Sequence, residues 1–461
     1  MPESKNKYSI IIPSFNEELF IGKNIKEIRK IMPGAEIIVV DCGSNDQTIN
    51  ICKREEVRVI KSKRGRGTQL NEGAKNADGN ILVFLHADTY LPKNASELYE
   101  QFFNKEKNKI CRFKLSFDIE HRLLNRYGKL SKLDLIFTRF GDMCIAVRRD
   151  FYFEAGGFPE WNFMEDVEFL RNASSKSRIV VLPASVISSA RAYLKHGFVN
   201  KQLINGLMLS KYTFGFRKFI ERNEYYNKKV KFSRASIIIF TKYPEEGKVK
   251  TRLASTIGYH YAMVFYKMIA EKIIFEVKRI RTIYTYIFFS EEKEKINVKK
   301  WLGQKYFYSH QEGEGLGERM YEAFRKVFGH GANKVILTGT DIPDLSKVII
   351  EEAIINLDNY DIVIGPAKDG GYYLLGMNKL HSSLFEDIEF STPSVLSQTI
   401  NTIEKLKLRY FLLPELQDID TNEELVDWLN NSQSSVLKKE IRLIYNLINR
   451  RIEKKCIHCG Q

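Results

Sequence analysis

The segment ILVFLHADT, residues 81–89, runs from five apolar residues directly into a histidine, an alanine and an aspartate. Short apolar runs of this kind alternate with helix-like runs, which is the pattern of a largely parallel sheet with helices on its faces. Before it stand YSIII, EIIVV and VRVI, and the pattern restarts further on with SIIIF, TIYTYIFF, KVILTG, DIVIG and RYFLL. The sequence therefore predicts an α/β fold with two consecutive domains, each built on a mostly parallel sheet.

Length and composition agree with this organisation. The chain has 461 residues, of which 44% are hydrophobic, so it is long for one domain and has enough apolar residues for two cores. No window approaches the roughly 18 uncharged apolar residues of a membrane span, and the start MPESKNKYSIIIP lacks the features of a signal peptide. We therefore expect a cytoplasmic protein whose six sparse cysteines are reduced packing residues.

The net charge of +15 indicates an anionic partner, and nucleotides, nucleic acid and acidic lipid surfaces all meet this requirement. The dense basic stretch TFGFRKFIERNEYYNKKVKFSR, residues 213–234, is interpreted either as a solvated connector or as a patch that faces a membrane or nucleic acid. We predict a first domain over 1–216, a basic connector over 217–234, a second domain over 235–430, and a C-terminal helix and tail over 431–461.

The tail NRRIEKKCIHCGQ contains Cys456, His458 and Cys459. Zinc sites usually take their four ligands from two such pairs, and this tail supplies one pair and a histidine. We interpret it as a disordered or partner-binding end in preference to a metal or redox site. A zinc site shared across a dimer is the alternative.

Carboxylates follow three of the predicted strands in the first half. Glu17 follows the first strand in IIPSFNEE, Asp41 follows the second in IIVVDCGSNDQT, and Asp88 follows a later strand in ILVFLHADT. One strand-end aspartate is usually a turn former or a helix cap. Three carboxylates on one predicted sheet edge instead indicate a candidate site for a cation or a nucleotide sugar.

Two helix starts add to this set. The stretch KSKRGRGTQLNEG places Arg64, Gly65, Arg66 and Gly67 ahead of a helix that we expect to start near Thr68. Glycines let the backbone approach a phosphate, and a helix N-terminus with nearby arginines attracts its charge. Alone this is a weak signal, because basic surface turns are common.

The second helix start carries Glu165 and Asp166, in the stretch MEDVEF. A carboxylate at that place suits a general base acting on a hydroxyl nucleophile. It equally suits an acidic first turn that complements the helix dipole.

Taken in order, the motifs resemble a family 2 glycosyltransferase with the GT-A fold, in particular the subgroup named for its association with radical SAM and selenium-related domains. The resemblance covers roughly residues 7–215 and rests on IIPSFNEE, VVDCGSNDQT, RGRGTQLNEGA, FLHADT, GDMCIAVRRDFYFEAGGFP, MEDVEF and SSAR. It implies that Asp41 contacts the nucleotide and that Asp88 holds a divalent metal, Mg²⁺ or Mn²⁺, on the diphosphate. It further implies that Asp166, with Glu165 beside it, contacts the acceptor hydroxyl and that Arg191 lies near the leaving diphosphate. Members of this family typically transfer the sugar with inversion of configuration at the anomeric carbon.

Two departures from the family pattern stand out. The usual double arginine and tryptophan after SSA appears here as Arg191-Ala192-Tyr193, which puts the contacts on the acceptor side in doubt. The metal motif begins with His86 where the family has an aspartate. This matters less, because the last aspartate of that motif is the usual ligand in the family.

The second half presents its own charged loops. FTKYPEEGKVKTRLAS follows the first strand of the restarted pattern and carries Lys242, Lys248, Lys250 and Arg252 around Gly247. Four cations on one strand-to-helix loop suit a triphosphate, although a basic surface loop is an equally good interpretation.

Acidic residues follow later strands of this half. Asp341 ends VILTGTD, the sequence DGG at 369–371 follows DIVIGPAK, and Asp418 and Asp420 lie in LPELQDIDT. Alternating aspartates present two carboxylates on one side of an extended segment, as a shared magnesium requires. Each aspartate taken alone would be interpreted as a turn residue.

These motifs resemble the companion transferase family of the same association (DUF2064), which is similar to nucleotidyltransferases such as the phospholactate guanylyltransferases and is also of GT-A type. The resemblance covers about 236–425 and rests on KYPEEGKVKTRLAS, GEGLGERM, GTDIPD, GPAKDGGYYLLG and DIDT. It implies that Lys248, Lys250 and Arg252 grip nucleotide phosphates with Lys242 nearby, that Asp341, Asp369 and Asp420 hold Mg²⁺, and that Gly370 and Gly371 shape the pocket.

The two resemblances together predict a bifunctional transferase that needs Mg²⁺ or Mn²⁺. The first domain would transfer a sugar from a nucleotide sugar to a small-molecule or lipid-linked acceptor. The second would transfer a nucleotidyl group from an NTP to a phosphorylated sugar or small metabolite, with Lys250 and Arg252 as its catalytic residues. Peripheral membrane contact fits the charge, and nucleic acid is not the expected partner. The alternatives are two sequential glycosyltransferases, or a basic scaffold with decayed pockets that binds nucleic acid or membranes.

Overall fold

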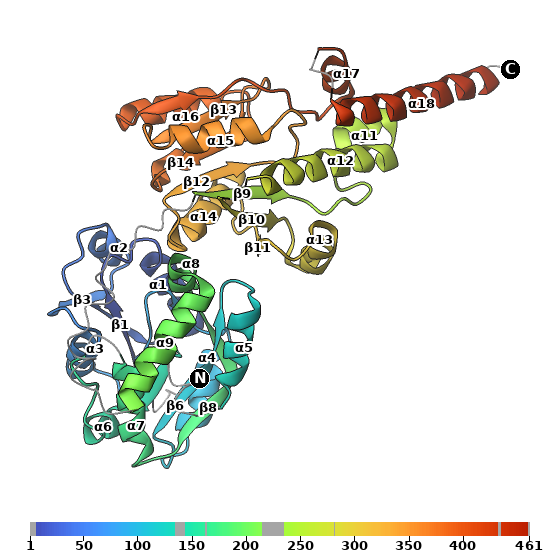
Figure 1. Cartoon of the computed structure of the whole chain (residues 1–461). Coiled ribbons are helices and arrows are strands. Elements are labelled where there is room, and N and C mark those ends of the chain that lie inside the picture. Colours follow the sequence, from blue (N-terminus) through green and yellow to red (C-terminus); the bar gives the residue numbers. More distant parts are fainter. Residues whose placement is uncertain are drawn as a thin grey trace. The chain divides into compact units, whose positions relative to one another are not determined.

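The computed structural model divides into two compact units, Met1–Phe232 and Ser233–Gln461 (Figure 1). It describes residues 6–133, 143–161, 164–213, 235–280, 282–431 and 435–459, with side chains as far as 448. The predicted basic connector 217–234 lies outside the described residues, as do the side chains of Cys456 and Cys459. In the described ranges, none of the helices combines the length and the apolar character that crossing a bilayer requires.

The first unit is built on an eight-stranded sheet of order β3-β2-β1-β4-β7-β6-β8-β5. Strands β3, β2, β1 and β4 are mutually parallel, β7 runs antiparallel to both β4 and β6, β6 and β8 are parallel, and β5 is antiparallel to β8. The strands are β1 (Tyr8–Ser14), β2 (Glu36–Asp41), β3 (Arg58–Lys61), β4 (Ile81–Phe84), β5 (Thr89–Tyr90), β6 (Ile110–Phe117), β7 (Ile145–Arg148) and β8 (Ile179–Ser188). The helices are α1 (Ile21–Ile31), α2 (Thr48–Arg54), α3 (Arg66–Lys75), α4 (Ala95–Phe103), α5 (Arg122–Leu130), α6 (Arg149–Glu154), α7 (Glu165–Ser174), α8 (Arg191–His196) and α9 (Phe198–Thr213).

Both faces of this sheet are buried, which explains why its strands are continuous apolar runs. Because side chains alternate along a strand, Ile10 and Ile12 of β1 pack into one core with α1, α2 and α4. Ile11, between them, packs into the opposite core with α3, α6 and α7. All three isoleucines are fully buried. The carboxyl ends of the central strands are therefore fixed from both sides.

The second unit is built on a seven-stranded sheet of order β11-β10-β9-β12-β14-β13-β15. Its strands are β9 (Ala235–Thr241), β10 (Tyr284–Phe289), β11 (Phe307–His310), β12 (Lys334–Thr338), β13 (Ile362–Pro366), β14 (Tyr372–Met377) and β15 (Tyr410–Leu412). The helices are α11 (Thr251–Ile257), α12 (Tyr259–Lys278), α13 (Lys295–Leu302), α14 (Leu316–Gly329), α15 (Lys347–Asn356), α16 (Val395–Lys405), α17 (Asn422–Asn431) and α18 (Val436–Cys459), with short 3₁₀ turns at Glu292–Glu294 and Ser382–Leu384. One core packs β9 and β10 against α12, α15, α17 and α18.

The two sheets share one topology. In the first unit, the parallel strands β3-β2-β1-β4 are followed by the antiparallel strand β7 and then by the parallel pair β6 and β8. In the second unit, the parallel strands β11-β10-β9-β12 are followed in the same way by the antiparallel strand β14 and then by the parallel pair β13 and β15. The first sheet differs only in its extra edge strand, β5. The predicted fold class, α/β with two consecutive domains built on mostly parallel sheets, is confirmed. The repeated order was not visible in the sequence, because it lies in strand pairing and not in residue identity.

The shared register makes two aspartates equivalent. The fourth residue of β1, Ile11, pairs with Phe84, and the fourth residue of β9, Ile238, pairs with Leu337. Asp88 and Asp341 each lie four residues beyond these partners. Each unit therefore delivers an aspartate to the same place, just past the end of its fourth strand.

Candidate active sites

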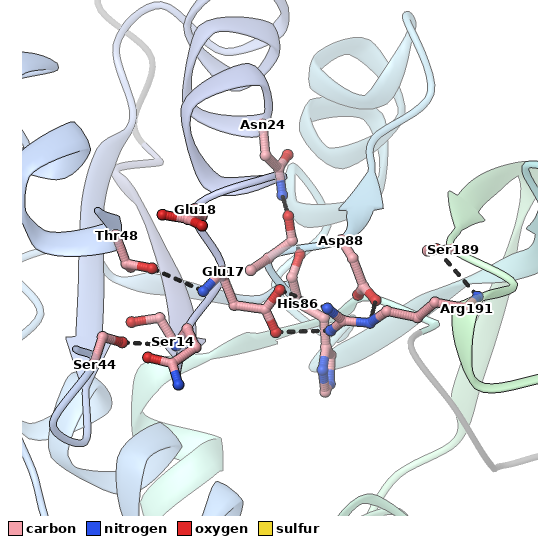
Figure 2. A network of polar contacts seen from close by, with 12 residues as sticks. Ser14, Glu17, Glu18, Asn24, Ser44, Thr48, His86, Asp88, Ser189 and Arg191 are labelled. Atoms are coloured by element: carbon pink, nitrogen blue, oxygen red, sulfur yellow. Dashed lines mark hydrogen bonds and ion pairs between the residues drawn. The ribbon is translucent and has the colours of Figure 1, made fainter. Parts of the chain in front are cut away.

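Three charged side chains meet where β1 and β4 end (Figure 2). Arg191, the first residue of α8, donates through Nη1 and Nη2 to the two carboxylate oxygens of Glu17, and both N–O distances are 2.7 Å. Its Nε lies 2.8 Å from Oδ2 of Asp88, and its guanidinium carbon lies 4.9 Å from the centre of the Phe20 ring. The Asp88 side chain is only 7% exposed. A planar guanidinium thus holds two carboxylates from neighbouring strand ends in one fixed arrangement.

The turn that carries Asp88 is held by Asn24, a residue that sequence reasoning missed. From α1, its Nδ2 donates to the carbonyl oxygens of His86, Ala87 and Thr89 over 3.0, 3.0 and 3.1 Å. Asn24 is fully buried and lies among the isoleucines on the inner face of α1. That placement was the available signal, because a polar residue on an apolar helix face must find buried partners.

We expect Asn24→Ala to lower the free energy of unfolding by about 2 kcal/mol, because it leaves buried carbonyl groups without their donor. The variant should also lose stabilisation by nucleoside diphosphate with Mn²⁺, since the Asp88 turn loosens. Urea unfolding and thermal shift measure the two effects. Asn50→Ala, which removes an amide from an exposed contact with Gln47, is the control. Equal stabilities for Asn24→Ala and wild type would contradict this positioning role.

Asp41 is saturated with hydrogen bonds from its own surroundings. Its carboxylate accepts from Ser14 Oγ at 2.9 Å, from the backbone N–H groups of Gly43 and Ser44 at 2.8 and 2.9 Å, and from Ser44 Oγ. Burial alone would raise the pKa of Asp41, but the bonds from Ser44, Gly43 and Ser14 outweigh it and hold this pKa below its ordinary value. Asp41 is therefore ionised at neutral pH and shapes the turn after β2. That turn is joined to the Glu17 turn because Asn16 N–H donates to Ser44 Oγ at 2.8 Å.

The starts of α3 and α7 form a second group of predicted residues. Arg66 Nη1 lies 3.4 Å from Oε1 of Glu165, whose side chain is 1% exposed. The neighbouring Asp166 is partly exposed, and its Oδ1 accepts from the N–H of Val167 at 2.8 Å. The structure therefore distinguishes the two acidic residues. Glu165 is buried in an ion pair, whereas Asp166 keeps contact with solvent.

The basic glycine loop enters its helix earlier than expected. Helix α3 starts at Arg66 and not near Thr68, so this boundary prediction was wrong by two residues. Gly67 lies inside the first turn, where a Cβ atom would stand only 1.9 Å from the carbonyl oxygen of Pro159. This glycine is required for close packing against the segment before α7.

The two departures from the family pattern have structural partners. Tyr193 is buried and packs edge-on against the ring of Phe117 at 5.5 Å, and it stacks on Phe198 at 6.4 Å. His86 offers its carbonyl oxygen to Asn24. Tyr193 thus joins α8 to the sheet and to α9.

In the second unit, a buried lysine lies between two aspartates. Lys250 Nζ lies 2.5 Å from Oδ1 of Asp341 and 2.5 Å from Oδ1 of Asp420. The lysine side chain is 4% exposed and each aspartate is 45% exposed. Burial would lower the pKa of Lys250, but the two carboxylates outweigh it and raise this pKa above the ordinary lysine value. The ammonium therefore stays charged at neutral pH.

The other three cations of this loop differ from Lys250. Lys242, Lys248 and Arg252 are exposed. Lys248 pairs with Glu245, three residues earlier, at 2.8 Å. The structure thus separates one buried cation at the carboxylate pair from three surface cations that remain accessible to a phosphate.

Around Asp420 lies a concentration of acidic groups. Burial, and then the charges of Asp369, Glu424 and Asp420, raise the pKa of Asp418 to about 6. Asp369 accepts from the N–H of Gly371 at 2.9 Å. Glu424 instead accepts from the N–H of Asp420 at 2.6 Å at the start of α17. The two aspartates of the predicted Asp-x-Asp pair therefore differ in their surroundings. Asp420 contacts Lys250, whereas Asp418 is partly buried near other carboxylates.

Glycine is required at the turn after Asp369. Gly370 has a φ of +86°, and a Cβ there would lie 2.2 Å from the carbonyl oxygen of Pro393. Its own carbonyl accepts from the N–H of Leu396. The turn thus packs directly on the segment that leads into α16.

A second residue missed from the sequence is Tyr266 on α12. Its buried hydroxyl lies 3.0 Å from Thr241 Oγ1 and 3.0 Å from Thr340 Oγ1, and it accepts from the N–H of Lys242 at 2.8 Å. Burial, followed by the charge of Asp341, raises the pKa of Tyr266. This hydroxyl ties the ends of β9 and β12 together beside the site. Tyrosine on an apolar helix gave no distinguishing signal.

The carboxylate pair of each unit suits a divalent cation such as Mg²⁺ that is bound partly by the protein and partly by a phosphate ligand. In the described part of the chain, no three or more His, Cys, Asp or Glu side chains are grouped to hold a metal by themselves. Each unit instead presents a carboxylate pair, Glu17 with Asp88 and Asp341 with Asp420, converging on one positive charge. Mg²⁺ typically takes one or two carboxylates and completes its shell with water and substrate phosphates. These residues fit such a site.

Each unit contains a segment that matches a family model. Residues 9–148 match the model described as Glycosyl transferase family 2. Residues 273–392 match the model described as Uncharacterized protein conserved in bacteria (DUF2064). The first unit is therefore similar to glycosyltransferase family 2 over residues 9–148, and the second unit is similar to DUF2064 over residues 273–392.

Individual relatives cover parts of the chain. The dolichyl N-acetyl-alpha-D-glucosaminyl phosphate 3-beta-D-2,3-diacetamido-2,3-dideoxy-beta-D-glucuronosyltransferase of Methanococcus voltae is 32% identical over 121 residues, which is 23% of this chain and 37% of that protein. The GalNAc(5)-diNAcBac-PP-undecaprenol beta-1,3-glucosyltransferase of Campylobacter jejuni is 27% identical over 176 residues, 33% of this chain and 55% of that protein. A solved structure described as a "putative nucleotide-diphospho-sugar transferase from Desulfovibrio desulfuricans G20" is 32% identical, and the match covers 47% of this chain and 98% of that chain with a TM-score of 0.45. The chain thus spans only part of the curated relatives it matches.

Proposed function

We propose that the first unit transfers a glycosyl group from a nucleotide sugar to a hydroxyl acceptor with a divalent metal, Mg²⁺ or Mn²⁺. The observation that carries this proposal is the Glu17–Arg191–Asp88 network at the end of β1 and β4, inside a family 2 domain. In open α/β sheets, ligands bind at the carboxyl ends of strands. The position of Asp88 and Arg191 at that edge supports binding of a nucleoside diphosphate with its metal.

In this proposal Asp88 holds the metal, the turn that Asp41 shapes receives the nucleoside, and Arg66 supports the phosphate end of the nucleotide. Glu17 orients Arg191, whose guanidinium is placed to accompany the departing diphosphate. The metal, when bound, neutralises charge on that leaving group. The protein supplies the position of each charge, which is where most electrostatic stabilisation of a transition state originates.

Asp166 is the proposed general base, because it is partly exposed at the start of α7 while Glu165 is committed to Arg66. We expect Asp166→Asn to lower kcat by about 10²- to 10⁴-fold with little change in KM for the nucleotide sugar. Initial rates of nucleoside diphosphate release measure both constants.

Asp150→Asn is the matched control for this prediction. Asp150 is also the second residue of its helix, and its Oδ1 accepts from the next N–H, of Phe151, at 2.7 Å. Equal losses in the two variants would show that Asp166 acts only as a helix-start residue.

The acceptor class that we propose is a sugar hydroxyl on a glycan that is linked to a lipid phosphate or diphosphate. The names of both relatives include a lipid carrier, dolichyl in one and undecaprenol in the other. The experiment incubates wild type with UDP-, GDP- and dTDP-sugars and Mn²⁺ or Mg²⁺, with either a polyprenyl-linked sugar phosphate or free sugars as acceptor. We expect product only when metal, nucleotide sugar and lipid acceptor are combined. Transfer to free sugars alone would overturn the lipid assignment and keep the glycosyltransferase.

For the second unit we propose nucleotidyl transfer from an NTP to a phosphorylated sugar or small metabolite. Lys250, Asp341 and Asp420 supply the cation and carboxylates, and the exposed Lys242, Lys248 and Arg252 supply phosphate contacts. In-line attack on the α-phosphate releases pyrophosphate and needs little beyond positioning and charge. Pyrophosphate release with each NTP and a panel of sugar phosphates is the test.

The shared strand order favours one second candidate, a pair of glycosyltransferases acting in sequence. This candidate predicts no pyrophosphate release from any NTP. It predicts instead that part of the nucleoside diphosphate release from nucleotide sugars persists in Asp88→Asn and in Asp341→Asn, and that the release disappears only when both substitutions are combined.

A further inference from the structure

Helices α5 and α9 of the first unit contain no acidic residues. Neither 121–133 nor 189–213 contains an aspartate or glutamate, although these make up 57 of the 461 residues. Five cations in these stretches are exposed, and none of them forms an ion pair in the described part of the chain. They are Arg122, Arg126, Lys129 and Lys132 around α5, and Lys195 on α8.

Large apolar side chains stand among these cations. Leu130 and Leu133, at the end of α5, are 46% and 51% exposed. Val199, Leu203 and Leu207 on α9 are 61%, 66% and 55% exposed. The three residues of α9 are spaced four apart, so they form one stripe along the helix. We call the five apolar residues and the five cations the α5–α9 surface.

The two helices belong to one surface and connect to the proposed active site. The His121 ring, just before α5, stacks on the ring of Phe198 at the start of α9, with centroids 3.7 Å apart and 8° between the planes. In Figure 1 both helices lie on the viewer's side of this unit. Helix α8, which precedes α9, begins at Arg191. The surface therefore extends from the residue that contacts Asp88 and Glu17.

We propose that the α5–α9 surface binds an anionic membrane. The combination of a basic face with protruding aliphatic residues is that of a helix pair lying in a membrane interface, where the apolar residues enter the headgroup boundary and the cations pair with lipid phosphates. A site for single-stranded nucleic acid would instead expose aromatic rings for base stacking. The large exposed apolar residues of this surface are leucine and valine.

A consequence for the substrate rests on the proposed function. A protein held at a lipid surface by α5 and α9 meets an acceptor whose hydrophobic part stays in the membrane and whose phosphate reaches the Arg191 end of α8. This favours a membrane-embedded acceptor over a soluble one. Membrane binding itself does not depend on glycosyl transfer.

The test is co-sedimentation of the full chain with vesicles of phosphatidylcholine alone or with about a third phosphatidylglycerol. We expect binding only to the anionic vesicles, weakened by high salt. Arg126→Glu/Lys129→Glu should reduce the partition coefficient at least about tenfold, and Leu203→Glu/Leu207→Glu should do the same.

Matched controls use exposed residues outside the α5–α9 surface. Lys105→Glu/Lys107→Glu reverses two exposed charges that flank Glu106 in the same unit. Val348→Glu/Ile355→Glu alters two apolar residues of α15 that are 70% and 63% exposed. Both controls should bind vesicles as wild type does.

Three outcomes would overturn this proposal. One is equal binding of all variants and controls. Another is binding to duplex DNA but not to vesicles, lost on charge reversal, which would assign a nucleic-acid site. The third is a dimer in solution that Leu203→Glu/Leu207→Glu dissociates, which would assign the stripe to a second copy of this chain. Stabilisation by nucleoside diphosphate and Mn²⁺ should be unchanged in every surface variant. If the proposed function is wrong, this ligand stabilisation will be absent from wild type as well, whereas vesicle binding will not be affected.

Discussion

The Asp88→Asn variant is expected to lower kcat/KM for glycosyl transfer by about a thousandfold, the upper range for losing one preorganised charge in an active site. Asparagine keeps the size of the side chain and can still accept from Arg191 Nε, so the fold should persist. What disappears is the negative charge that the proposal assigns to the metal. Rates of nucleoside diphosphate release and thermal shift with Mn²⁺ measure the two consequences.

Asp341→Asn is the internal control, because Asp341 occupies the equivalent position after the fourth strand of the second sheet. It should abolish pyrophosphate release and leave glycosyl transfer within about twofold of wild type. Asp88→Asn should do the reverse. Loss of both activities in either variant would contradict two independent sites, and retention of more than a tenth of glycosyl transfer in Asp88→Asn would contradict the metal role.

Lys250→Met is expected to lower the free energy of unfolding by about 2 kcal/mol and pyrophosphate release by at least about a hundredfold. Removing one partner of a fully buried ion pair costs about 3–5 kcal/mol, and the half-exposed aspartates reduce this value. Urea unfolding is followed by fluorescence of Trp301 and Trp428 in a Trp161→Phe background, so that only the second unit reports.

Lys248→Met controls for the loss of a cation on the same loop. Its ion pair with Glu245 is solvent-exposed, so we expect no measurable change in the free energy of unfolding. Because the folded-state pKa of Lys250 is raised, its stabilisation is complete below the ordinary lysine pKa and is lost only as the pH rises above it. The difference between wild type and Lys250→Met should therefore be constant from pH 6 to about pH 9. A difference that vanishes at pH 7 would contradict the ion-pair explanation.

Much of the fold was predictable because it depends on the local pattern of apolar and polar residues. Alternating apolar runs gave the two sheets, and a polar residue directly after each run gave Glu17, Asp88 and Asp341 their place at a sheet edge. Parallel strands deliver such residues to a common edge whatever the loops do. The roles assigned to these residues stay predictions.

What the sequence did not reveal depends on contacts between distant residues. Arg191 and Glu17 are 174 positions apart, and nothing near either residue indicates their bidentate pair. Lys248 and Lys250 look alike in the sequence, yet one is buried between carboxylates and the other is on the surface. Such distinctions come from packing, which residue type and spacing do not encode.

Under the proposed function, the side chains of Arg191 and Lys250 compete with the divalent metal for the carboxylates of Asp88 and Asp341. A divalent cation that approaches Asp88 or Asp341 has to displace a protein cation already held there, so metal alone should bind weakly. A nucleotide changes this balance, because its phosphates offer the displaced guanidinium or ammonium a new anionic partner. Metal and nucleotide affinities should therefore be thermodynamically linked, each ligand tightening the other by the same factor. Arg191 and Lys250 would in this way disfavour binding of the metal alone and favour binding of metal and nucleotide together.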